Sequence, residues 1–168
     1  MSTILNTNGD SLIVPALSGA VKGNFVVVTA EWNPSVTHTL RDGAIKVLIE
    51  SGIPQERIIS LEVPGTVELI SAAAMAANSD KTAVVIVIGC VIRGDTPHFD
   101  YVCQIASQGV ASINAAGKVP VIFGVLTVNN LEQAHQRAGG ILGNKGAEAG
   151  VAAVRMANLH SFWNSHGL

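Results

Sequence analysis

Short apolar runs rich in β-branched residues alternate along the chain with longer segments whose apolar residues recur at helical spacing. The run NFVVVTA at residues 24–30 is typical of a strand in the middle of a parallel sheet. The next segment places Leu40, Ala44 and Leu48 on one face, as an amphipathic helix does. This alternation predicts strands at 24–30, 57–63, 83–90 and 120–126, and helices at 36–51, 66–78, 98–116, 131–138 and 145–159.

Polar residues and glycines indicate where these elements begin and end. Thr66 follows Pro64-Gly65 and is expected to cap the second helix. Asn130 is expected to cap the fourth helix, with Gln133 in the capping-box position. The glycines between residues 139 and 143 are expected to break the chain before the last helix.

Four strand-then-helix units in succession need right-handed crossovers, and therefore a parallel sheet covered on both faces. We predict an α/β fold, a flavodoxin-like three-layer α/β/α sandwich with a four-stranded parallel sheet. Residues 24–159 are expected to form one domain. Residues 1–23 are weakly patterned and are expected to be an N-terminal extension available for pairing with a neighbouring subunit, and residues 160–168 a polar, frayed tail.

Charge and hydropathy narrow the classes of partner. The net charge is −2 and no basic run occurs, so a nucleic-acid partner is not expected. The longest apolar run, residues 83–92, is far shorter than the roughly 20 residues of a membrane-spanning helix. The first residues lack the pattern of a secretory signal or a transit peptide, which favours a cytoplasmic protein with no membrane partner.

The composition also predicts self-association. Charged residues make up 13% of the chain, where about 25% is ordinary, and the mean hydropathy is +0.41. Because no membrane segment takes up the excess apolar surface, we expect an obligate oligomer. Cys90 and Cys103 lack the spacing of a disulfide framework or a zinc site, so neither a metal nor a disulfide is expected.

Candidate chemistry lies directly after the strands, because ligands of open parallel sheets bind outside the carboxyl ends of their strands. Trp32 could stack on a planar heteroaromatic ligand beside the Asn33 amide, although exposed aromatics more often serve packing or an interface. The turn Gly94-Asp95-Thr96 could hold a phosphate at a helix N-terminus, or could simply be a turn. His98 could exchange protons near neutral pH, or only begin its helix.

Other polar residues have equally plain structural interpretations at this point. The run from Thr66 to Glu68 is explained as a helix cap with a favourable first-turn carboxylate. Arg137 and Lys145 would by default be solvated helix residues.

Five ordered motifs, taken together, point further than any one of these residues. They are GCVIRGDTPHFDYVC from Gly89, PGTVE from Pro64, FGVLT from Phe123, EQAHQRAGG from Glu132 and GNKGAEA from Gly143. In their order along the chain they resemble the lumazine synthase family of riboflavin biosynthesis over nearly all of residues 24–159. The resemblance implies a transferase that condenses 5-amino-6-(D-ribitylamino)uracil with 3,4-dihydroxy-2-butanone 4-phosphate, without metal or organic cofactor.

The resemblance also implies a role for each candidate residue. Trp32 would stack on the pyrimidine, Asn33 and Glu68 would hold the ribityl chain, and His98 would shuttle protons. The butanone phosphate would bind Arg137 and the turn Gly94-Asp95-Thr96. The remaining substrate-binding residues implied are Thr66, Val67, the backbone of Cys90, Val91 and Ile92, and the residues Phe123 and Lys145, which together with Arg137 would reach the site from a neighbouring subunit.

Family members are pentamers or assemblies of pentamers, including icosahedral shells, and riboflavin synthase is a further partner that the resemblance suggests. Two alternatives remain at this stage. A flavodoxin-like module could bind a flavin or riboflavin without turnover, because one fold hosts many functions. A structural shell could also form in which catalysis is secondary.

Overall fold

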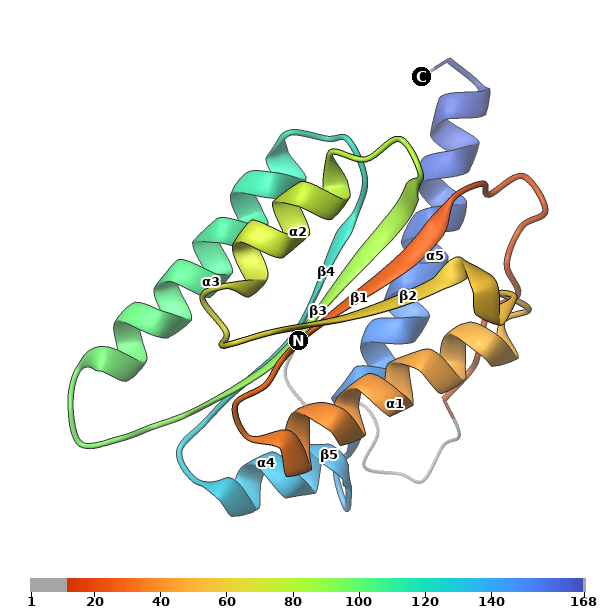
Figure 1. Cartoon of the computed structure of the whole chain (residues 1–168). Helices are drawn as coiled ribbons and strands as arrows, with labels where there is room; N and C mark the ends of the chain where they lie inside the picture. Colours follow the sequence, from red (N-terminus) through yellow and green to blue (C-terminus); the bar gives the residue numbers. More distant parts are fainter. Residues whose placement is uncertain (1–11, 168) are drawn as a thin grey trace.

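A parallel four-stranded sheet forms the middle layer of the computed structural model, which describes residues 12–167 (Figure 1). The strands lie side by side in the order β2-β1-β3-β4, and every neighbouring pair is parallel. Their bounds are Asn24–Ala30 for β1, Ile58–Val63 for β2, Thr82–Ile92 for β3 and Val121–Val128 for β4. The predicted fold class is therefore confirmed.

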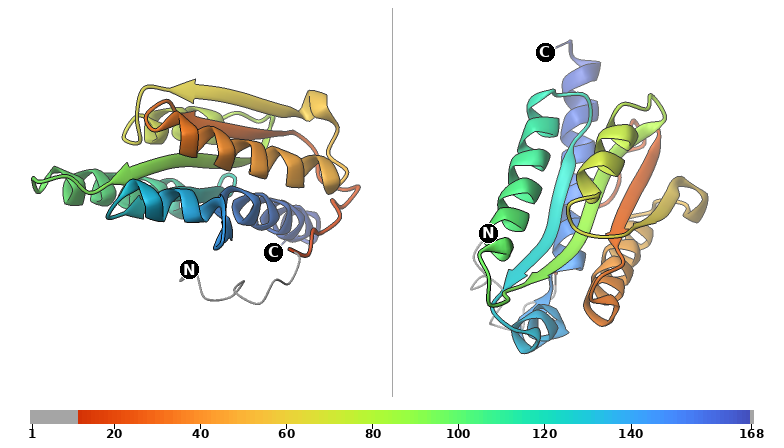
Figure 2. Two further views of the ribbon diagram at one scale, coloured as in Figure 1. Left: turned by 90° about the horizontal axis from the view of Figure 1, so that it is seen from below. Right: turned by 60° about the vertical axis from the view of Figure 1, so that its left-hand side comes forward.

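Helices cover both faces of this sheet, α1 and α5 on one side and α2 and α3 on the other (Figure 2). A short 3-10 turn, Gln55–Arg57, precedes β2, and a small hairpin of Ala138–Gly140 and Gly143–Asn144 (β5 and β6) stands where the glycines were expected to break the chain. The helices are Pro34–Glu50 (α1), Leu69–Ala77 (α2), His98–Ala115 (α3), Leu131–Arg137 (α4) and Lys145–Ser165 (α5). Within residues 12–167, no helix is long and apolar enough to cross a bilayer.

The central strands β1 and β3 bury alternate residues on opposite faces. Phe25 and Val27 pack with α1 and α5, whereas Val26 and Val28 pack with α2 and α3. Because both faces are covered, these strands are apolar at nearly every position, as the continuous runs in the sequence indicate.

Two predicted boundaries are wrong. The last helix does not end at Leu159 but continues to Ser165. No helix-breaking residue lies between Leu159 and Gly167, and Phe162 stacks on His166 with ring centroids 4.0 Å apart. Thr66 does not cap the second helix, which begins at Leu69 without a side-chain cap. The Thr66 side chain is buried instead beside β3, where a Cβ added to Gly89 would lie 3.1 Å from its Oγ1.

The cap predicted for the fourth helix is confirmed. The Asn130 side chain accepts a hydrogen bond from the Gln133 backbone N–H at 2.9 Å. The Gln133 side chain reaches back, although it accepts from the backbone N–H of Asn129 rather than from Asn130 itself. Asn144 makes an equivalent cap for α5, accepting from the backbone N–H groups of Gly146 and Ala147.

The described part of the N-terminal extension lies against the body of the same chain. The Leu17 backbone N–H donates to the Ser51 carbonyl at 2.9 Å. Asn158 clamps the segment, accepting from the Ser18 N–H and donating to the Ala16 carbonyl. The rest of the extension that was expected to pair with a neighbour, residues 1–11, lies outside the described residues.

The contact between α1 and α5 gives a stability prediction. A Cβ added at Gly146 would lie 1.8 Å from the Leu40 carbonyl oxygen, which is backbone and cannot rotate away. Gly146→Ala should therefore lower the free energy of unfolding by about 1 to 3 kcal/mol through overpacking, although alanine favours a helix. Gly19→Ala is the control, because no atom lies within 4 Å of a Cβ added at that position. Equal thermal midpoints for the two variants, at one protein concentration, would contradict this account.

Candidate active site

The loop after β1 presents Trp32 and Asn33 at the carboxyl edge of the sheet. The Trp32 side chain is 73% exposed, unusual for an indole, and so offers a free ring face. Asn33 has a left-handed backbone conformation, with φ 60° and ψ 54°, which asparagine tolerates better than most residues. Its Nδ2 donates to the Cys90 carbonyl at 3.0 Å, so it joins the end of β1 to the end of β3.

The PGTVE motif forms the turn after β2 and lies beside the indole. A Cβ added to Gly65 would lie 3.6 Å from Trp32 Cδ1 and 2.9 Å from Glu68 Oε2. Trp32 and the Glu68 carboxylate therefore flank one buried glycine, and a side chain at that position would push between them. Glu68 is exposed and Val67 partly buried.

The end of β3 contributes backbone rather than side-chain chemistry. Cys90 is buried, and burial raises the pKa of its thiol to about 11, so the thiol is neutral at physiological pH. Val91 and Ile92 extend the strand beyond its pairing with β1 and pair with Thr127 and Val128 of β4, in a partly buried stretch. We name the residues gathered at these three strand ends the strand-end cluster: Trp32, Asn33, Thr66, Val67, Glu68, Cys90, Val91 and Ile92.

A surface loop, residues 93–97, continues β3 into α3. Gly94 has open space around it, with no atom within 4 Å of an added Cβ, and Asp95 and Thr96 are exposed. His98 is exposed as the first residue of α3, and the N-cap is Pro97. Capping therefore does not explain His98, because the capping position belongs to the residue before it. The loop and helix start offer backbone N–H donors and an exposed imidazole to the solvent.

Phe123, Arg137 and Lys145 lie together, but in a different place. They line a cavity of about 520 Å³ along β4 and α5, whose walls contain no residue of the strand-end cluster. Lys145 Nζ lies 2.6 Å from Glu148 Oε2, and the two side chains are only 18% and 25% exposed. Lys145 is thus a partly buried ion-pair partner rather than a solvated helix residue. We name this the β4-edge cavity, because β4 is one of the two outer strands of the sheet.

Sequence reasoning missed Glu148 in this cavity, although its spacing of three residues from Lys145 on a helix is a readable signal. Sequence reasoning also included Arg93 in a motif without assigning it a role of its own. Among residues 12–167, no group of three His, Cys, Asp or Glu side chains is arranged to hold a metal ion.

Comparison with known proteins decides the family. Residues 22–161 match the family described as 6,7-dimethyl-8-ribityllumazine synthase. The chain belongs to that family. The resemblance identified from the five motifs is therefore confirmed.

Curated relatives named 6,7-dimethyl-8-ribityllumazine synthase are identical to the chain at about half of the aligned residues. The relative from Porphyromonas gingivalis is 53% identical over 133 residues, covering 79% of this chain and 83% of that protein. The relative from Bacteroides fragilis is 53% identical over 136 residues, covering 80% and 94%. The relative from Phocaeicola vulgatus is 48% identical over 135 residues, covering 80% of each.

Asn33 provides a prediction about how the strand-end cluster is held together. Asn33→Ala removes the hydrogen bond to the Cys90 carbonyl. It also places alanine, which has a Cβ but no polar side chain, in the left-handed backbone region. It should lower the free energy of unfolding by about 1 to 2 kcal/mol. Asn33→Gly loses the bond but suits the backbone, so its stability in urea unfolding should lie between the wild type and Asn33→Ala. A glycine variant less stable than the alanine variant would refute the backbone argument.

Proposed function

We propose that the chain condenses 5-amino-6-(D-ribitylamino)uracil with 3,4-dihydroxy-2-butanone 4-phosphate, giving 6,7-dimethyl-8-ribityllumazine, phosphate and water. Its membership of the lumazine synthase family is the observation that carries this proposal. The reaction is a transferase step of riboflavin biosynthesis. The groups on the page suit it, because imine formation, elimination and ring closure need binding, orientation and proton transfer.

The strand-end cluster would bind the uracil. The exposed Trp32 ring would stack on the pyrimidine, since its face is free. The Asn33 Nδ2 is already engaged with the Cys90 carbonyl, so its Oδ1 would accept from a ribityl hydroxyl, and the Glu68 carboxylate would accept from another. The backbone of Val91 and Ile92, together with Cys90, would meet the uracil edge, with Thr66 and Val67 shaping the turn beside it.

The loop after β3 would bind the butanone phosphate and move protons. Gly94, Asp95 and Thr96 would offer backbone N–H groups at the start of α3, where the helix dipole favours an anion. Arg137 would add charge-assisted hydrogen bonds to the phosphate. His98 would carry protons during imine formation and phosphate elimination, and it stands next to this loop with its side chain exposed.

Two subunits would build one complete site. Phe123, Arg137 and Lys145 line the β4-edge cavity and not the strand-end cluster, so we propose that they complete the site of a neighbouring copy. A repeated contact of one face with a different face closes into a ring, which fits a homopentamer or an assembly of pentamers. The active site would then lie at the subunit interface.

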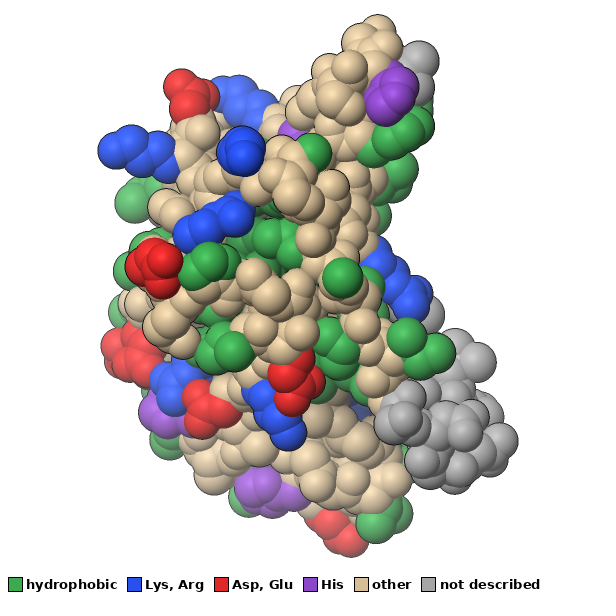
Figure 3. Space-filling model, turned by 90° about the vertical axis from the view of Figure 1, so that its right-hand side faces the viewer, with side chains coloured by type: hydrophobic (Ala, Val, Ile, Leu, Met, Phe, Trp, Pro, Cys, Tyr) green, Lys and Arg blue, Asp and Glu red, His purple; other side chains and the backbone are tan. Residues whose placement is uncertain are grey.

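Exposed apolar side chains support such an assembly. Hydrophobic groups lie open between the charged ones on the face shown in Figure 3. The edge strand β2 exposes Ile59 and Leu61, and we propose that the N-terminal extension of a neighbour pairs there. The short connection between Gly139 and Gly146 has no insertion and resembles that of shell-forming family members, which favours a sixty-subunit shell. Riboflavin synthase would be a partner inside this shell. We place the assembly in the cytoplasm.

An assay with both substrates tests the proposed function. Purified protein should release one phosphate for each lumazine formed, and native mass should be a multiple of five subunits. Tight riboflavin binding without turnover would instead support the flavin-binding module. An assembled particle with neither turnover nor ligand binding would support a structural shell.

Arg137 gives a prediction about substrate selectivity. Arg137→Ala removes a charged donor to phosphate, so it should raise the KM for the butanone phosphate about ten- to a hundredfold. The KM for the ribitylaminouracil should change much less. Arg155→Ala, an exposed arginine of α5, is the matched control. Equal effects on both substrates, in a variant that still assembles, would show that Arg137 is structural.

His98 gives a prediction about turnover. His98→Ala should reduce kcat by about 10²- to 10⁴-fold without abolishing it, because proximity of the amine and the ketone supplies much of the acceleration. His98→Asn keeps a polar side chain that cannot exchange protons, so it should be equally slow. A wild-type rate for His98→Asn at saturating substrates would contradict the acid–base role.

A further inference from the structure

Arg93 stands where β3 becomes the loop that precedes α3. Its backbone N–H donates to the Val128 carbonyl at 2.9 Å, so the main chain of Arg93 is tied to the end of β4. Beyond this bond the chain leaves the sheet, and residues 94–98 are all exposed. Arg93 is therefore the last residue that the sheet holds in place before the loop begins.

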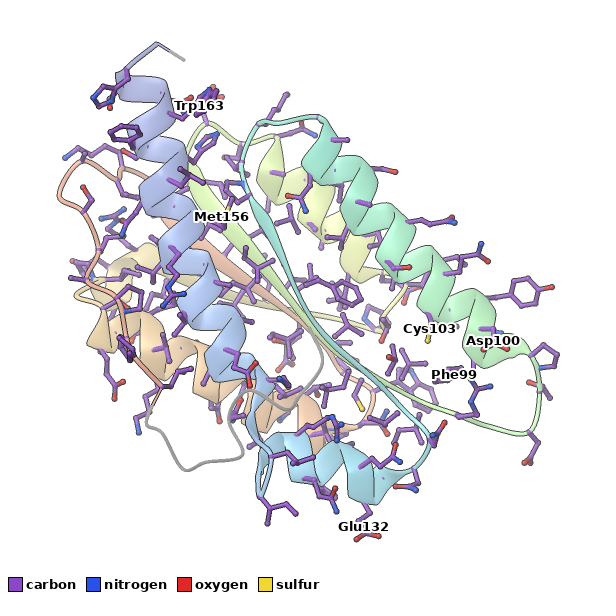
Figure 4. All side chains as sticks on the ribbon, turned by 180° about the vertical axis from the view of Figure 1, so that it is seen from behind. Phe99, Asp100, Cys103, Glu132, Met156 and Trp163 are labelled. Carbon is purple, nitrogen blue, oxygen red and sulfur yellow. The ribbon has the colours of Figure 1, made fainter. Side chains whose placement is uncertain are left out.

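The Arg93 side chain spans the loop and contacts the first turn of α3. Its Cζ lies 4.1 Å from the centre of the Phe99 ring, within range of a cation–π contact. Its Nη2 lies 3.2 Å from Asp100 Oδ1, an ion pair. Figure 4 shows Phe99 and Asp100 at the start of α3, where the helix leaves this loop. One guanidinium thus joins the two ends of the loop.

The loop has little else to hold it. Within the described part of the chain, the side chains of Asp95 and Thr96 make no hydrogen bond, and the backbone hydrogen bonds of this stretch run from the N–H groups of Asp100 and Tyr101 to the Pro97 carbonyl. Gly94 adds conformational freedom without a side chain to pack. Removing the contacts of Arg93 would therefore leave residues 94–96 anchored only through their neighbours in the chain.

The cysteine beside this group does not disturb the ion pair. Cys103 lies one turn along α3 from Asp100, and burial, together with the Asp100 carboxylate, raises the pKa of its thiol. The thiol is therefore neutral at physiological pH and does not compete with Asp100 for the guanidinium.

We propose that Arg93 is a positioning residue which, through Phe99 and Asp100, holds the loop 94–97 and His98 in the conformation that binds the phosphate-bearing substrate. We name the three side chains the Arg93 latch. The proposal rests on the proposed function for the identity of the substrate, but the holding of the loop does not depend on it. Arg93 itself acts on Phe99 and Asp100, not on substrate.

A direct phosphate contact by Arg93 is the competing explanation, and the partners of Arg93 separate the two. If Arg93 bound phosphate itself, Asp100→Asn would free its guanidinium and leave the KM for the butanone phosphate unchanged or lower. If Arg93 positions the loop, then Arg93→Gln, Asp100→Asn and Phe99→Leu should all raise that KM. The side chains of Arg93 and Asp100 are 46% and 63% exposed, so each contact is weak, and the expected increase is about three- to tenfold.

The experiment uses the assembled enzyme and two readouts. Steady-state kinetics gives the KM for each substrate, and hydrogen–deuterium exchange without substrate reports the hydrogen-bonded backbone amides of residues 93, 100 and 101, which flank the loop. Lys46→Gln, which breaks an exposed ion pair on α1, is the matched control and should alter neither readout. Asp100→Asn is the variant that is expected to fold normally, because it keeps the size of an exposed side chain.

The latch predicts faster exchange at the amides of residues 93, 100 and 101 in all three variants, with the KM increase confined to the butanone phosphate. Unchanged exchange in Arg93→Gln and Asp100→Asn would overturn the proposal. So would an increase in KM for Arg93→Gln alone. A wild-type protein without turnover would refute the proposed function, whereas the exchange measurement would still decide whether the latch holds the loop.

Discussion

Burial of β1 and β3 on both faces is the interaction on which the rest of the structure depends. Strands covered on both sides must be apolar throughout, and parallel strands need helices as crossovers. The same arrangement places the carboxyl ends of all four strands at one edge. Chemistry is therefore confined to the loops that leave this edge, while the strands themselves contribute a rigid base and, at Cys90, a backbone carbonyl.

The sheet positions two sets of functional groups, each of which is incomplete by itself. The strand-end cluster has an open indole, an amide and a carboxylate, but none of the cations of the β4-edge cavity. The β4-edge cavity has two cations, Arg137 and Lys145, one carboxylate, and the Phe123 ring in place of an indole. The shared site that we propose would account for so apolar a chain, since assembly would bury surface and complete the chemistry at the same contact.

The sequence was sufficient for those parts of the fold that local pattern controls. The bounds of β1 were predicted to the residue, because a β-branched run between polar residues leaves little freedom. The start of α3 and the cap at Asn130 followed from the same local chemistry. The loop residues of the candidate site were found because each follows a strand, and the family motifs then gave them roles that remain proposals.

Other features depended on contacts between distant residues, which no local pattern shows. Thr66 is placed like a cap in the sequence, yet it is buried because Gly89 leaves room beside it. The tail after Leu159 is polar but lacks a helix breaker, so α5 continues. Arg93 was overlooked because its partners become visible only when the loop brings Phe99 and Asp100 beneath its guanidinium.

Mixed assemblies test the shared site most directly. His98→Ala and Arg137→Ala subunits, co-expressed with different tags, can be purified as particles that contain both. If a site combines His98 of one copy with Arg137 of its neighbour, random mixing restores about a quarter of the sites, and activity should rise well above that of either variant alone. Mixed particles no more active than the average of the two separate variants would contradict a site built from two subunits.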